Sequence, residues 1–261
     1  MAAKYSKAPI SQLSLGFFLS PTALLSKGIL FELIQRLLGD YPTINTHPVF
    51  PIDELTNGTT MQAQMDYAKT GFSTYRLISE DAKWQILILQ DMVTLHWNRQ
   101  DEESVGNYPG FSFAFDKFKI IYNITSDLFK KYDLDFEGSL KSYYLVYTDR
   151  VDMEPYKSKG LGITDIINVS APNFYYNSEK YSANNYWNRY STPCDILNGY
   201  SLITVNSPSP DLVNQILIVE NKLKGFHSDG SNIDKWFDIA HDIQCSFFEN
   251  IFKSDILKSW E

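Results

Sequence analysis

Three short segments with alternating side chains, followed by one long helical pattern, constrain the fold of this chain more than any other feature. Residues 72–78, 84–89 and 92–98 read as strands with tight connections between them, which predicts an antiparallel meander. Because side chains alternate along a strand, His96 and Trp97 point to opposite faces of the predicted sheet. We therefore expect one face to pack into the core and the other face to be wetter.

A long amphipathic helix follows the meander. Apolar residues recur three and four positions apart between Phe111 and about Lys131, which is typical of a helix with one buried face. Upstream, residues 10–19 predict a strand and residues 24–38 a helix, and residues 43–70 predict an irregular connection with one short strand. Strands combined with long amphipathic helices indicate an α+β protein.

The second half of the chain follows a similar plan. It predicts a strand over 140–148, a Gly-broken segment over 160–169, strands over 195–205 and 212–220, and a closing helix that Ser231 caps. We expect two loosely similar α+β halves, 1–136 and 137–261, joined in one compact unit. Their antiparallel sheet or sheets would carry the long helices on one face.

Composition narrows the classes of partner and the compartment. The net charge is −8, which disfavours nucleic acid and anionic membranes as direct partners. No run of about 18 apolar residues and no secretory pattern occurs, so we expect neither a membrane span nor export. The two cysteines, Cys194 and Cys245, are too few for a disulfide framework or a zinc site. A cytoplasmic location fits best.

Common catalytic and cofactor motifs are missing from the sequence. It contains no P-loop, no H-E-x-x-H and no G-x-S-x-G. Gly160 and Gly162 begin like a dinucleotide fingerprint, but Asp165 occupies the third glycine position. The four histidines show no metal-ligand spacing. We therefore predict no cofactor and no metal.

Four scattered polar residues are the candidates for a catalytic site, if the chain is an enzyme. They are His96, Arg99, Asp149 and Arg150. A histidine on the wetter face of a strand can act as a general base in a cleft. The simpler interpretation is that His96 hydrogen-bonds a neighbour and that Arg150 pairs with local carboxylates at a strand end.

A polar segment crowded with aromatic rings, residues 172–190, is the candidate for binding a partner. A solvated loop rarely carries so many rings, so the segment either packs over the core or presents rings to another protein. The candidate partner-binding residues are Tyr175, Tyr176, Tyr181, Tyr186, Trp187 and Tyr190.

Several short segments spread along the chain carry a resemblance to a known family. They are Ala8–Ile10, His96–Arg99 with Tyr108–Phe111, Tyr147–Val151, and Ile233–Phe237 with Ala240, His241 and Trp260. In these segments the chain resembles a sporadically distributed family of uncharacterised bacterial and archaeal proteins of about this length. The resemblance implies an accessory protein of mobile or defence-associated gene clusters, and it brings no established activity or catalytic residues.

Three functional hypotheses follow. The leading one is a non-catalytic binding or regulatory protein that docks a protein partner, encoded in the same operon, within an antiviral or other mobile gene cluster. The alternative is a hydrolase or nucleic-acid-processing enzyme whose scattered residues are assembled by the fold. The third is a small-ligand sensor with a pocket enclosed by the two halves.

Overall fold

A computed structural model of the chain describes residues 7–48, 73–100, 108–168, 187–206, 216–227 and 232–261. Its strands are β1 (Ile10–Leu19), β2 (Thr43–Pro48), β3 (Ser73–Ile78), β4 (Trp84–Ile88), β5 (Met92–Asn98), β6 (Leu140–Asp152), β7 (Trp187–Cys194), β8 (Gly199–Asn206) and β9 (Ile216–Phe226). Its helices are α1 (Ile29–Leu37), α3 (Phe111–Lys131), α4 (Phe136–Ser139), α5 (Glu154–Lys157), α6 (Ile163–Ile166), α7 (Ile233–Ile251) and α8 (Ser254–Ser259), with 3₁₀ turns η1 (Ala23–Gly28) and η3 (Asp195–Leu197). The predicted α+β class is confirmed.

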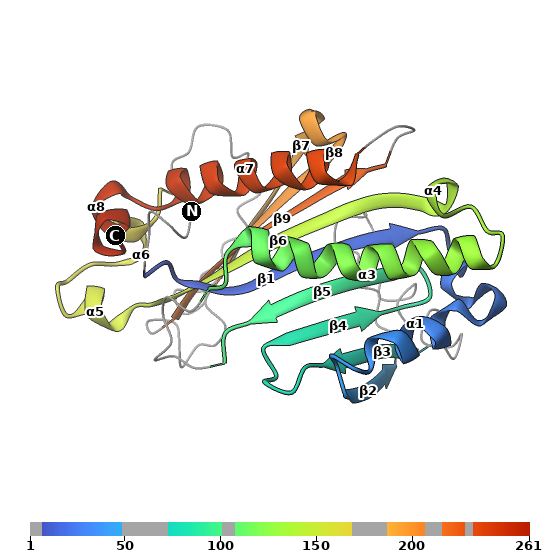
Figure 1. Ribbon diagram of the computed structural model, residues 1–261. Helices are drawn as coiled ribbons and strands as arrows, with labels where there is room; N and C mark the ends of the chain where they lie inside the picture. The colour runs from blue at the N-terminus through green and yellow to red at the C-terminus, as the bar shows by residue number, and fades with distance from the viewer. Residues whose placement is uncertain (1–6, 49–72, 101–107, 169–186, 207–215, 228–231) are drawn as a thin grey trace.

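The strands form a single nine-stranded sheet in the order β2-β3-β4-β5-β1-β6-β9-β8-β7, and each neighbouring pair is antiparallel (Figure 1). The first strands of the two predicted halves, β1 and β6, pair at its centre. Within each half, the last strand folds back beside the first, so β5 lies next to β1 and β9 next to β6. The division into halves 1–136 and 137–261 and an internal duplication both stay predictions.

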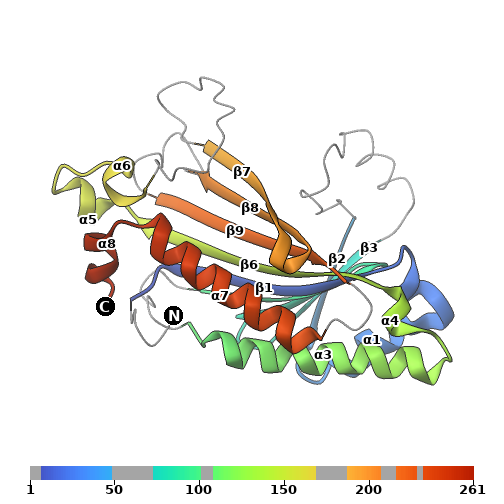
Figure 2. The same ribbon diagram turned by 90° about the horizontal axis from the view of Figure 1, so that it is seen from above.

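The long helices α1, α3 and α7 lie on one side of the sheet (Figure 2). The core fills the space between them and the sheet. Phe17 of β1 packs against Phe118 of α3 with ring centroids 6.0 Å apart, and Phe237 of α7 lies 5.1 Å from Phe118. All three side chains are fully buried. This face of the sheet is the predicted core face.

The strand β6 is longer than its sequence pattern predicted. It continues through Asp152, paired with β9 along its whole length, instead of ending at Thr148. The partner strand explains the difference, because its apolar residues Leu217 and Val219 continue the ladder past Thr148. The residues from 149 to 152 therefore alternate between the two faces, so Asp149 and Arg150 point to opposite sides of the sheet.

The second half also differs from its prediction at β7 and at the start of α7. The strand β7 was not predicted; it contains the end of the aromatic segment and pairs with β8. Ser231, the predicted cap, lies outside the described residues. Asn232 caps α7, and its side-chain oxygen accepts hydrogen bonds from the backbone N–H groups of Asp234 and Lys235.

In the part of the chain that the structure describes, no helix combines the length and apolar character needed to cross a membrane.

Candidate functional site under helix α7

A chain of hydrogen-bonded polar groups lies between β6, α7 and the residues just before α3. The Tyr147 hydroxyl is 2.9 Å from the Tyr108 hydroxyl and 3.1 Å from Nδ1 of His241. The His241 ring stacks on Phe111 with centroids 4.0 Å apart and planes 6° apart. His241 is therefore a hydrogen-bonded histidine at the edge of the core.

Burial keeps this network electrically neutral. Desolvation lowers the pKa of His241 to about 4 and raises that of Tyr147 well above its usual value, because both charged forms lose water. Cys245 Sγ lies 3.6 Å from Nε2 of His241, and burial raises the thiol pKa as well. A nucleophilic cysteine needs a lowered pKa and a cationic neighbour. His241 and Cys245 are therefore both neutral, as expected for residues with a structural role.

Among the carboxyl groups of this region, Asp149 has the pKa that is shifted furthest from its usual value. It follows Tyr147 on the same face of β6, and its side chain is 3% exposed. Burial raises its pKa to about 8, and the positive charge of Arg99 opposes this rise only in part. At neutral pH the carboxyl group is therefore mostly protonated. Its Oδ1 atom is buried without a hydrogen-bond partner.

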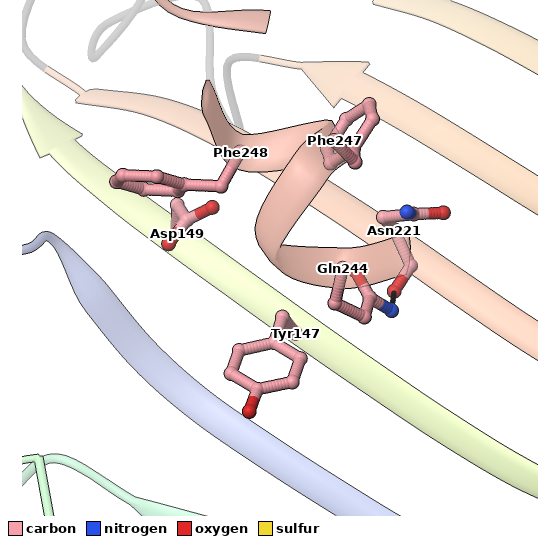
Figure 3. A pocket seen from close by; sticks show the side chains of 6 residues that line it. All are labelled: Tyr147, Asp149, Asn221, Gln244, Phe247 and Phe248. Carbon is pink, nitrogen blue, oxygen red and sulfur yellow. Dashed lines mark hydrogen bonds between the residues drawn. The ribbon is translucent and has the colours of Figure 1, made fainter. Parts of the chain in front are cut away.

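Asp149 lines a narrow pocket with five other residues, shown in Figure 3. The lining residues are Tyr147, Asp149, Asn221, Gln244, Phe247 and Phe248. Gln244, on α7, donates from Nε2 to the backbone oxygens of Asn221 at 2.8 Å and Leu145 at 3.4 Å. Its Oε1 atom is buried and has no partner. Two unpartnered oxygens, from Asp149 and Gln244, thus belong to the walls of one pocket.

A second polar cluster lies on the opposite face of the sheet. His96 Nδ1 is 2.7 Å from Ser14 Oγ, and its Nε2 is 2.7 Å from Thr94 Oγ1. Burial, together with the charge of Arg76, lowers the pKa of His96 to about 4. The neutral ring therefore donates at one nitrogen and accepts at the other. This agrees with the simpler interpretation of His96 as a strand histidine bonded to its neighbours.

The structure does not bring the four candidate catalytic residues together. The side chain of Asp149 lies in the core on the helix side, whereas alternation along β5 and β6 places His96 and Arg150 on the opposite side. Of the other three candidates, only Arg99 affects Asp149, because its positive charge lowers the pKa of that carboxyl group. The alternative hypothesis of an enzyme that uses all four residues loses its geometric basis.

The candidate partner-binding residues fall at the limit of the described chain. Tyr175, Tyr176, Tyr181 and Tyr186 lie outside the described residues. Trp187 and Tyr190 belong to β7, the last strand of the sheet order, paired with Asn206 and Ile203 of β8.

An exposed apolar group lies beside β7 and was not predicted from the sequence. We call it the corner patch, and it consists of Ile196, Tyr200 and Phe226, which are 70%, 40% and 45% exposed. The rings of Tyr200 and Phe226 meet edge to face at 5.9 Å. The backbone N–H of Phe226 donates to the carbonyl of Asn198, which joins the end of β9 to the η3 turn. Exposed apolar side chains on adjoining strand ends and a turn form a surface that another protein can cover.

Gln244 and Tyr108 were also missed as functional candidates. Gln244 interrupts the apolar stripe of α7 at a buried position, and a polar residue in such a stripe is the signal that could have identified it. Tyr108 gave no comparable signal, because its contact with Tyr147 joins residues that are 39 positions apart.

Among the described residues, no group of three or more His, Cys, Asp or Glu side chains is arranged to hold a metal ion. No protein-family model and no curated protein sequence matches the chain.

Proposed function

We propose that the protein is a non-catalytic accessory protein that docks a protein partner through the corner patch at β7, β8 and the end of β9. The supporting observations are the ring contact between the exposed Tyr200 and Phe226 and the exposure of Ile196 in the η3 turn, which is joined to the end of β9. Exposed aromatic and aliphatic side chains supply most of the binding energy at protein interfaces when a partner covers them. The patch adjoins β7, which carries two of the candidate partner-binding residues, Trp187 and Tyr190.

The chemistry of the buried networks supports a binding role over catalysis. Tyr147, His241 and Cys245 hold each other as neutral groups, and His96 is neutral between two hydroxyl groups. A general base works best with a pKa near the operating pH, and both histidines have a pKa of about 4. These protonation states suit fixed hydrogen bonds that hold helix and sheet in place.

The kind of partner follows from the resemblance of the chain to the sporadically distributed prokaryotic family. The partner in this proposal is a protein encoded in the same gene cluster, as in an antiviral or other mobile system. The acidic chain, with a net charge of −8, repels nucleic acid and so favours a protein partner.

The test is co-purification with the proteins encoded by the neighbouring genes, expressed together with the full chain. The variant Ile196→Ser/Tyr200→Ser/Phe226→Ser should weaken binding by about tenfold or more, because apolar anchors are lost. The matched control is Phe31→Ser/Phe113→Ser/Ile120→Ser, which removes three exposed apolar side chains (61%, 52% and 57% exposed) from helices α1 and α3. Equal binding by both variants, each with an unchanged thermal midpoint, would overturn the proposal.

A further inference from the structure

The two border strands of the sheet differ in how their outer edges are protected. β2 and β7 lie at the two ends of the strand order (Figure 1), and among the described residues each pairs with one neighbouring strand. The outer edge of a border strand carries backbone N–H and C=O groups that a further strand can pair with, and charged residues or prolines usually prevent this. β7 contains Arg189 and Pro193. From Thr43 to Thr46, β2 contains neither kind of residue and is exposed to solvent.

An apolar group lies along the helix-side face of the β2 edge. Ile44 is 41% exposed and lies opposite Leu77 of β3, which is buried on the helix side. Tyr75 of β3 is on the same face, diagonal to Ile44, and side chains in this relation come within about 7–8 Å of each other. The ring of Tyr75 meets that of Phe31 from α1 at 6.4 Å, and Phe31 is 61% exposed. We call Phe31, Ile44 and Tyr75 the β2 patch.

The surface beside the β2 patch does not share the acidic excess of the chain, whose net charge is −8. Glu32, the neighbour of Phe31 on α1, accepts hydrogen bonds from Lys131 at 2.7 Å and from Arg36 at 3.0 Å. The hydrogen bond from Lys131, together with those from Tyr132 and Arg36, lowers the pKa of Glu32 to about 2. One acidic group is thus balanced by two cations, so two copies of the chain can approach here without meeting net negative charge.

We infer that the protein forms a two-fold dimer in which β2 of one copy pairs antiparallel with β2 of a second copy. A two-fold axis at Ile44 places this residue opposite its own copy and Thr43 opposite Asn45. The uncharged side chains of β2 tolerate such self-pairing, whereas a charged side chain would meet a like charge. With strands about 4.8 Å apart, the two β3 strands lie about 14 Å apart. Phe31 and Ile44 of both copies fill the space between the two α1 helices.

The dimer joins two nine-stranded sheets into one continuous sheet. The corner patch lies on β8, β9 and the η3 turn, toward the opposite end of the strand order from β2. Pairing through β2 therefore leaves both corner patches exposed, one near each outer end of the dimer. Docking of a partner at the corner patch does not require the dimer, so either proposal can fail without the other.

The experiment is sedimentation velocity on the full-length protein at concentrations from about 5 µM to about 500 µM. We expect a species of twice the monomer mass whose fraction grows with concentration. Ile44→Lys places like charges opposite each other and should weaken association by about tenfold or more. The matched control is Ile120→Lys, at a 57% exposed position of α3, which should dimerise like the wild type. A wild type that stays monomeric at the highest concentration would overturn the inference.

A second variant and a second measurement locate the interface. Phe31→Ser removes an exposed ring of the β2 patch and should weaken association by about threefold or more. It serves as the test variant if Ile44→Lys lowers the thermal midpoint. Hydrogen exchange of the β2 backbone N–H groups should be slower in the wild-type dimer than in the dilute monomer, because pairing protects the edge. If β2 exchanges at the same rate in both states, or if Phe31→Ser and Ile44→Lys dimerise as tightly as Ile120→Lys, the dimer uses another surface and the inference is wrong.

Discussion

The two faces of the central strands carry different chemistry, although they are built from alternating residues of the same segments. On β6, Asp149 faces the helices and its neighbour Thr148 faces the other way. Thr148 Oγ1 donates to Glu220 Oε2 at 3.3 Å, and Glu220 pairs with Lys222 at 3.2 Å. Asp149 is buried in the core, which raises its pKa to about 8. A step of one residue therefore changes a charged, paired environment into a dry one.

The difference shows that burial, more than residue type, determines the protonation states of the polar groups on this sheet. The helix side surrounds its polar groups with large rings and keeps them neutral, as with Tyr147 and His241. The opposite side uses short hydroxyl side chains, Ser14 and Thr94, to hold His96. The predictions below test this contrast, from the largest expected effect to the smallest.

The largest loss of stability should come from removing a large side chain from the core on the helix side. Phe237 is 0% exposed and contacts Phe115, Phe118 and Tyr143. Phe237→Ala should lower the free energy of unfolding by about 3–5 kcal/mol. Tyr200→Ala, at a 40% exposed position of the corner patch, should cost less than about 1 kcal/mol. Urea denaturation of both variants measures the difference, and similar losses would contradict the assignment of the core to the helix side.

The second effect is a pH dependence caused by Asp149. Its pKa is raised from 3.8 to about 8 in the folded protein. The unfolded chain therefore loses this proton at lower pH, and the protein loses stability as pH rises from about 4 to about 8. Asp149→Asn removes this penalty. Its stability relative to the wild type should increase by about 2 kcal/mol between pH 6 and pH 8. Denaturation at both pH values tests this, and a pH-independent difference would show that Asp149 is not protonated.

The third effect tests close packing on the opposite face. A Cβ atom on Gly16 would lie 2.4 Å from Thr94 Cγ2 and 3.1 Å from the Val93 oxygen. Gly16→Ala should therefore lower the free energy of unfolding by about 1–3 kcal/mol. Thr94→Ser removes the methyl group and keeps a hydroxyl for His96. The double variant should recover part of the loss, and a double-mutant cycle without coupling would contradict this contact.

The smallest effect concerns the start of α7. The side chain of Asn232 accepts hydrogen bonds from two backbone N–H groups at the helix start. Asn232→Ala should cost about 1 kcal/mol, and Asn232→Asp should be nearly neutral because it keeps the acceptor. Thermal denaturation compares the two variants. Equal losses of stability in the two variants would mean that the side-chain acceptor of Asn232 does not stabilise the start of α7.

The elements with strong local periodicity could be predicted from the sequence. The helix over 111–131 and the strands over 10–19 and 92–98 lie where the patterns placed them, because the spacing of apolar residues alone determines these elements. The strand β7 was missed, since its pattern of aromatic and polar residues carries no clear core face. The end of β6 was misplaced because a non-local partner, β9, extends the pairing to Asp152.

The candidate sites depended on contacts that no local pattern contains. His96 was correctly placed on the face opposite to Trp97, but its partner Ser14 is 82 positions away. Asp149 was selected as one of four candidate catalytic residues, whereas the sheet register buries it and separates it from Arg150. The corner patch arises where a turn and two strand ends meet in space. Registers and burial of this kind are tertiary properties.

The most direct test of this account is the titration of the Asp149 carboxyl group by ¹³C NMR, assigned by comparison with Asp149→Asn. The contrast between the two faces of the sheet predicts that burial keeps the carboxyl group of Asp149 protonated at neutral pH. We expect its Cγ resonance to titrate with a pKa of about 8 while most carboxyl groups titrate below about pH 5. A resonance that titrates near the ordinary aspartate value would contradict the account.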